Sequence, residues 1–180
     1  MDQETTKNLL AAIISRRSIR KFDQEKPVPP ALVREILEAG RFAPSGLNNQ
    51  PWRFAIIRRP QLKEQLAQLT HYHQIVRQAP VLIAVLLDTE ALYHREKDIQ
   101  SVGACLENLL LAAHGLGLGA VWLGEILKRG REVVDLLQLP ERYELMAVVA
   151  LGYPAPGYQP KPAQRRPLKE LILFEDDADG

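Results

Sequence analysis

Apolar residues along the chain alternate between helical spacing and short uninterrupted runs. Helical spacing predicts five helices, at residues 5–15, 30–41, 61–69, 98–116 and 131–139. Pro30 is well placed as the first residue of the second helix, and Asp98 as the cap of the fourth. Apolar runs predict four strands, at residues 52–58, 79–87, 120–123 and 145–152. The run 79–87 contains no polar residue, which is typical of a strand buried on both faces.

This alternation of helices and strands predicts an α+β or α/β domain in three layers. The chain has 180 residues, so we expect one domain over residues 1–180. Prolines recur after Tyr153, which favours an extended C-terminal arm over residues 156–180 with a frayed acidic end. Helix 98–116 is apolar almost all round, so the rest of the domain or a second subunit must cover it.

Charge and cysteine content exclude several classes of protein. The net charge is +1, from 23 basic and 22 acidic residues, which gives no support for binding nucleic acid or an anionic membrane. Cys105 is the single cysteine, so neither an intrachain disulfide nor a cysteine-based zinc site is expected. His71 and His73 lack a third metal ligand. With no secretory signal and no apolar run of membrane-spanning length, we expect a cytoplasmic protein without membrane contact.

Two polar segments carry the candidate chemistry. Residues 16–20 place three guanidiniums around the hydroxyl of Ser18, and residues 44–51 hold side-chain amides between two prolines. Guanidinium forks suit a phosphate, and amide edges suit a heterocycle rich in donors and acceptors. Taken alone, the first segment also fits a solvated basic helix end, and the second a simple turn.

Glycines at 115, 117 and 119 do not form a dinucleotide fingerprint, because their spacing differs and they follow a predicted helix. Gly115 is explained more simply as a helix C-cap. Gly124 lacks a Cβ and would let main chain approach a flat ring closely. No nucleophile and base pair stands out, which favours chemistry carried by a cofactor.

Four segments together resemble the FMN-dependent nitroreductase family, in the family's order and spacing. They are residues 16–22, 44–52, 115–124 and 165–168. The resemblance implies a three-layer α/β/α fold with a mixed, mainly antiparallel sheet. It also implies a homodimer that exchanges its C-terminal arms and binds FMN at the subunit interface.

Site residues follow from the same resemblance. The residues that match the family's N-terminal flavin motif are Arg16, Ser18 and Arg20, with Arg17 beside them. The residues that match the loop lent by the partner subunit are Pro44, Ser45, Gly46 and Asn48. Leu123 and Gly124 match the backbone beside the flavin ring, and Arg165 matches the C-terminal phosphate contact.

In this interpretation Arg16, Ser18 and Arg165 bind the phosphate. Arg20 stabilises negative charge on the reduced ring, and no side chain is assigned as catalytic. The chain has Ala163 where many relatives have lysine, and Lys161 is the nearest substitute. Only a short segment, 88–97, fills the place where many relatives insert a longer lid.

The resemblance implies ping-pong chemistry, in which NADH or NADPH reduces the flavin and a nitroaromatic, quinone or related small electrophile accepts the electrons. Relatives of the family also catalyse dehalogenation, flavin fragmentation and heterocycle oxidation. These reactions, and a flavin-binding protein without activity, remain alternatives.

Overall fold

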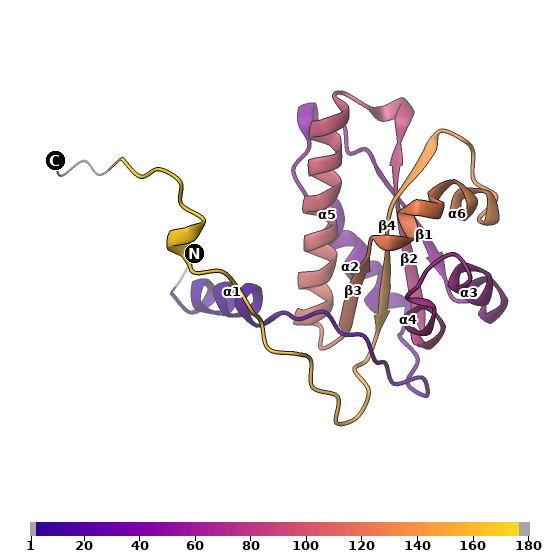
Figure 1. Cartoon of the computed structure of the whole chain (residues 1–180), viewed down its shortest axis with the longest axis horizontal. Coiled ribbons are helices and arrows are strands. Elements are labelled where there is room, and N and C mark those ends of the chain that lie inside the picture. The colour runs from indigo at the N-terminus through magenta and orange to yellow at the C-terminus, as the bar shows by residue number, and fades with distance from the viewer. Residues whose placement is uncertain (1–2, 177–180) are drawn as a thin grey trace.

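A four-stranded antiparallel sheet forms the centre of the protein in a computed structural model that describes residues 3–176 (Figure 1). Its strands are β1 (Trp52–Ile57), β2 (Val81–Asp88), β3 (Gly119–Leu123) and β4 (Tyr143–Gly152). The order is β1-β2-β4-β3, so β2 and β4 are central and β3 lies at one edge. Every residue of β2 is buried, as its apolar run predicts.

Helices cover both faces of this sheet and make three layers. The helices of one face are α2 (Pro30–Arg41) and α5 (Arg95–Gly115), which pack with Val81, Ile83, Val85 and Leu87 of β2. Those of the other face are α3 (Pro60–Ala67), α4 (His73–Gln78) and α6 (Gly130–Leu136), which pack with Leu82, Ala84 and Leu86. This alternation along β2 follows the two-residue period of a strand. The predicted α+β class and three-layer arrangement are confirmed.

The sheet is mainly antiparallel, as expected: the strands named above pair antiparallel, and a parallel pairing occurs as an isolated bridge between Ser18 and Ala120. Two details of the prediction are wrong. The short helix α4 was not predicted. Helix α5 begins at Arg95 with His94 as its N-cap, so Asp98 lies one turn inside the helix. Its carboxylate accepts hydrogen bonds from the backbone N–H groups of Tyr93 and His94, which lie before the helix.

Both ends of the described chain lie away from the three layers. Helix α1 (Gln3–Ser15) and the arm after residue 156 run beside each other in Figure 1, outside the sheet and its covering helices. The arm contains a turn at residues 156–157 and a short 3₁₀ turn, Leu168–Glu170, and its described part has no other helix or strand. The acidic end, which we expect to be frayed, includes residues 177–180, and these lie outside the described residues. Across residues 3–176, no helix combines the length and apolar character that a membrane crossing needs.

The covering of α5 is incomplete within one chain. Val102, Cys105, Leu106 and Leu109 are buried against the sheet and α2. Gly103 and Leu111, on other sides of the helix, are only partly covered, and a Cβ placed on Gly103 would meet open space. The prediction that a second subunit completes the cover stays a prediction.

Candidate functional site

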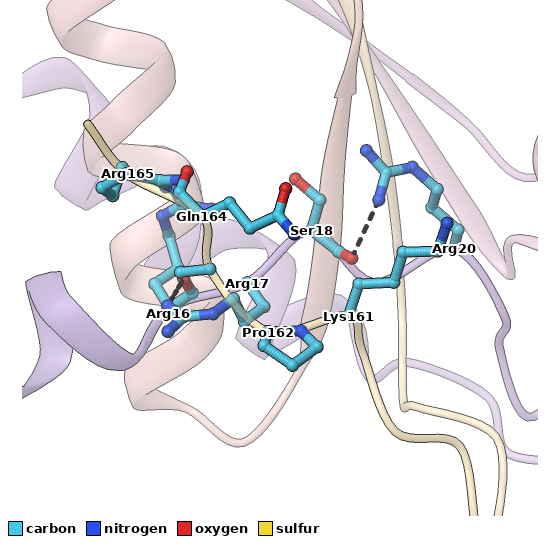
Figure 2. A pocket seen from close by; sticks show the side chains of 9 residues that line it. Arg16, Arg17, Ser18, Arg20, Lys161, Pro162, Gln164 and Arg165 are labelled. Carbon is cyan, nitrogen blue, oxygen red and sulfur yellow. Dashed lines mark hydrogen bonds between the residues drawn. The ribbon is translucent and has the colours of Figure 1, made fainter.

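A cavity of about 190 Å³ lies where the segment after α1 meets the C-terminal arm (Figure 2). The residues that line it are Arg16, Arg17, Ser18, Arg20, Lys161, Pro162, Ala163, Gln164 and Arg165. Two backbone hydrogen bonds bring the segments together, from Asp23 N–H to the Tyr153 carbonyl (2.9 Å) and from Ala155 N–H to the Lys21 carbonyl (3.1 Å). The predicted grouping of the N-terminal arginines with Arg165 is therefore present within a single chain.

The lining carries five cationic side chains and no carboxylate. In the described part of the chain, the one carboxylate that pairs with any of them is Glu107, which accepts from Arg16 Nε at 3.1 Å. Three of the other cations donate to backbone carbonyls instead. Arg17 donates to the carbonyls of Ile14 and Arg16. Arg20 donates to the carbonyl of Ser18, and Arg165 to that of Gln164. A guanidinium has five donors, so these contacts leave its positive charge and several N–H groups for an anion.

Lys161 and Gln164 also line the cavity; the sequence suggested Lys161 only as the nearest substitute for the missing lysine, and it gave Gln164 no role. Figure 2 shows Arg16 and Arg165 at one end, Arg20 and Lys161 at the other, and the side chains of Ser18 and Gln164 between them. A substitute for the lysine missing at Ala163 has to reach the same cavity, and Lys161 does so. From the sequence, the resemblance pointed to Arg165 and Lys161 in this region, whereas no signal pointed to Gln164.

The cavity lies at the start of edge strand β3. Ile19 N–H donates to the Ala120 carbonyl at 3.0 Å, next to the bridge between Ser18 and Ala120. Gly119 permits this approach, because a Cβ there would lie 2.6 Å from Ile19 Cγ2. Leu123 follows Ala120 by three residues, a distance of about 10 Å along a strand. A flat group could therefore extend from the cavity along the edge of β3 toward Gly124.

Gly124 is exposed at the end of β3 in open surroundings, because a Cβ placed on it would meet only Trp122 Nε1, at 3.8 Å. The next residue, Glu125, is held by two hydrogen bonds, from Thr70 Oγ1 (2.8 Å) and from His71 N–H (3.1 Å). The Thr70 hydroxyl contributes most to lowering the pKa of Glu125, and the His71 N–H adds to it. These bonds anchor the peptide that links Gly124 to Glu125.

The loop of residues 44–51 lies elsewhere in the same chain. Pro44, Ser45, Gly46 and Asn48 do not line the cavity. Asn49 donates to Asp98 in the first turns of α5, whereas Arg16 reaches Glu107 farther along the helix. Nine residues of helix separate these two contacts, which is about 13 Å along its axis. One chain therefore supplies the cavity and, some distance away, the loop.

The family model described as "Nitroreductase family" matches residues 13–74 and 68–153, which together span more than half of the chain. The chain belongs to the nitroreductase family. The family predicted from the four sequence segments is therefore confirmed.

Individual members of the nitroreductase family resemble the chain over most of its length. A protein of Methanothermobacter thermautotrophicus, described as an NADH dehydrogenase/NAD(P)H nitroreductase, is 37% identical over 150 residues, covering 82% of this chain and 78% of its own. An iodotyrosine deiodinase of Thermotoga neapolitana is 31% identical over 183 residues, covering 88% and 92%. A crystal structure from Desulfovibrio desulfuricans, described as a nitroreductase in complex with FMN, has a TM-score of 0.88 and 49% identity, covering 94% and 97%.

Histidines and the cysteine of this nitroreductase-family chain have local structural contacts. His114 Nε2 lies 2.9 Å from Ser15 Oγ and joins the end of α1 to α5, while His73 Nδ1 lies 2.9 Å from Arg77 Nη1. Among residues 3–176 there is no group of three or more His, Cys, Asp or Glu side chains that could hold a metal ion. Burial raises the pKa of Cys105 to about 12, so its thiol stays protonated as a small apolar group.

Proposed function

We propose that this protein is a homodimeric, FMN-dependent oxidoreductase. It takes electrons from NADH or NADPH and passes them to nitroaromatics, quinones or related electrophiles in a ping-pong cycle. The observation that carries the proposal is the cationic cavity between residues 16–20 and 161–165 in a member of the nitroreductase family. We also propose that the protein is cytoplasmic, as expected from its sequence.

The residues of the cavity fit the phosphate and ribityl end of FMN. A phosphate dianion needs several donors and positive charge without competing carboxylates, and the lining supplies both. The cavity volume of about 190 Å³ is smaller than the roughly 300–1,000 Å³ that whole small-molecule sites occupy. The ring therefore extends beyond the cavity, and the open edge of β3 at Leu123 and Gly124 offers one wall for it.

The second wall comes from the partner subunit in this proposal. The loop of residues 44–51 does not line its own chain's cavity, and its contact with α5 lies about 13 Å along the helix axis from that of Arg16. We infer that a two-fold dimer brings the loop of one subunit to the cavity of the other. Helix α1 supports such an interface, because Leu9, Leu10, Ile13 and Ile14 are all about half exposed or more. The exchanged C-terminal arm completes the same contact.

Within this site the protein binds the FMN, orients its ring and favours its reduced form. Bound FMN supplies hydride and electron transfer. Arg16 and Arg165 hold the phosphate, and the pair of Arg16 with Glu107 fixes the direction of one guanidinium. Arg20 places positive charge where negative charge develops on reduction. The anchored peptide between Gly124 and Glu125 gives the ring a fixed backbone neighbour.

Reductive dehalogenation is the second candidate, because an iodotyrosine deiodinase shares 31% identity over most of both chains. The segment between β2 and α5 is short, which leaves the acceptor side of the site open to different substrates. The same first half-reaction would then serve a halogenated phenol in place of a nitro compound.

Anaerobic reduction tests the proposal. Purified protein is titrated with NADH and with NADPH, and the visible absorption of bound flavin is followed. We expect one or both donors to bleach it, and a nitroaromatic or quinone to restore it. Restoration by iodotyrosine alone, with release of iodide, would favour dehalogenation. Colour that persists with both donors would contradict the proposed activity and leave a flavin-binding protein without turnover.

A further inference from the structure

The loop of residues 44–51 has an unusual backbone. Leu47, Asn48 and Gln50 all have positive φ angles, of 52°, 56° and 47°. Side chains with a Cβ disfavour this region, asparagine less than leucine or glutamine, so the surroundings must hold Leu47 and Gln50 there. Since Leu47 is 80% exposed, its own side chain does not supply the restraint.

Asn49 supplies much of the restraint from the middle of the loop. Its Nδ2 donates two hydrogen bonds of 2.8 Å, to the Ala91 carbonyl and to Asp98 Oδ1. Within residues 3–176 its buried Oδ1 has no hydrogen-bond partner. Turning the amide over would place that oxygen against two acceptors and lose both bonds, so one orientation of Asn49 is strongly favoured.

Asp98 is a rigid acceptor for this contact. Its side chain is fully buried, and its second oxygen accepts from the backbone N–H groups of Tyr93 and His94, at 2.8 Å each. Burial by itself would raise the pKa of Asp98, but the hydrogen bonds from Asn49 and from the two N–H groups hold it below its usual value. The carboxylate is therefore ionised and fixed at neutral pH.

The short segment before α5 grips the loop at a second point. A Cβ on Gly46 would lie 2.8 Å from Tyr93 Cδ1, so the Tyr93 ring packs directly on this glycine. Ser45 Oγ accepts from Gln50 N–H at 3.0 Å and closes the loop on itself. Residues 91–98 thus hold the loop through Ala91, Tyr93 and Asp98. This segment lies where many relatives insert a longer lid.

We propose that Asn49 is a positioning residue, which clamps the loop of residues 44–51 to Ala91 and Asp98 so that it presents one preformed surface to the flavin of the partner subunit. Asn49 itself need not touch the flavin. This inference rests on the proposed function, and it assigns residues 91–98 the role of a brace. Preformed loops improve binding because less conformational entropy is lost when the ligand binds.

The test compares Asn49→Ala with Asn108→Ala in the FMN-loaded protein. Asn108 is a matched control, because its Nδ2 donates to the Ala39 carbonyl at 3.3 Å and joins α5 to α2, not to the loop. Release of FMN on dilution is followed by flavin fluorescence. Hydrogen exchange of residues 44–51 is measured at saturating FMN, and thermal unfolding is measured for both variants.

We expect Asn49→Ala to release FMN about tenfold faster or more, with faster exchange in residues 44–51, whereas Asn108→Ala changes release less than about twofold. If both variants lower the unfolding temperature but neither changes release or loop exchange, Asn49 is merely structural and the inference is wrong. If Asn49→Ala does not fold, Asn49→Ser is judged by the same criteria. A wild-type protein that binds no FMN would overturn the proposed function as well, so the two failures are distinguishable.

Discussion

Cationic side chains gather at one small cavity in a chain whose net charge is only +1. Arg16 is oriented by Glu107, while Arg20 lies at the opposite end of the cavity beside Lys161 (Figure 2). This separation allows one cavity to perform two tasks, since one end can bind a phosphate and the other can face a ring that gains negative charge.

We predict that Arg20→Ala weakens FMN binding and shifts the two-electron flavin potential negative by about 30 mV or more, which corresponds to about 1.4 kcal/mol. The reason is the loss of a positive charge that favours the reduced form. Arg20→Lys, which keeps the charge, should shift the potential less. Spectroelectrochemical titration measures both values, and an unchanged potential in Arg20→Ala would limit Arg20 to binding.

Helix α5 connects the loop of residues 44–51, the cavity and the end of α1. Its first turns hold Asp98 and the loop, its middle pairs Glu107 with Arg16, and its last turn contacts Ser15 through His114. Its position depends on α2, which approaches closely at Gly40. A Cβ on Gly40 would lie 2.5 Å from Leu109 Cδ2 and 3.4 Å from Cys105 Sγ.

We therefore expect Gly40→Ala to lower the free energy of unfolding by about 1–2 kcal/mol, because overpacking exceeds the helix propensity that alanine adds. Gly115→Ala is the control, since a Cβ there meets nothing within 4 Å. Urea unfolding of FMN-loaded protein measures both. If Gly40→Ala were as stable as the wild type, the contact between α2 and α5 at Gly40 would adjust to a Cβ without loss of unfolding free energy, which would contradict this prediction.

Elements with a strong apolar pattern were predictable from the sequence. Helix α2 has its predicted bounds, and β4 begins two residues before the predicted position. Helix α4 was missed because only Ile75 and Val76 of its six residues are buried and no side chain caps it. The start of α5 was misplaced because Asp98 caps from inside the helix, by reaching back to Tyr93 and His94.

Part of the site was predictable only through the family resemblance. Arg16 and Arg165 are 149 positions apart, and no local pattern relates them, yet both line one cavity. The contact of Asn49 with Asp98 has no sequence signal, because an asparagine in a loop and an acid near a helix start are each ordinary features. In the proposed site, contact between the loop and the flavin needs a second subunit, and the apolar and polar pattern of one chain carries no signal for such a contact.

Several large apolar side chains are exposed near both ends of the described chain, as is typical of a surface that another protein subunit covers. Ile14 of α1 is 71% exposed, and in the arm Leu173 and Phe174 are 96% and 82% exposed. Helix α1 and the arm lie beside each other and away from the layered body (Figure 1). A second copy that packs against both would bury these side chains and place each loop against the other subunit's cavity.

Truncation tests the role of the arm. We predict that a protein ending at residue 166, which keeps every residue that lines the cavity, dissociates to monomers at concentrations where the full chain is dimeric. The lost contacts are those of Leu168, Leu171 and the apolar residues after them. A protein ending at residue 176 is the control. Analytical ultracentrifugation measures both, and a fully dimeric short form would contradict this role.

Subunit complementation tests the shared site most directly. Arg165→Ala damages the cavity, and Asn48→Ala damages the loop, so each homodimer has two defective sites. If the cavity and loop of each site come from different subunits, a mixed dimer has one site with both changes and one with neither. Random co-assembly should then restore turnover to about a quarter of the wild-type value. Arg165→Ala mixed with Arg16→Ala should restore none, because both residues belong to the same half of the site. Absence of recovery in the first mixture would contradict a flavin site built from two chains.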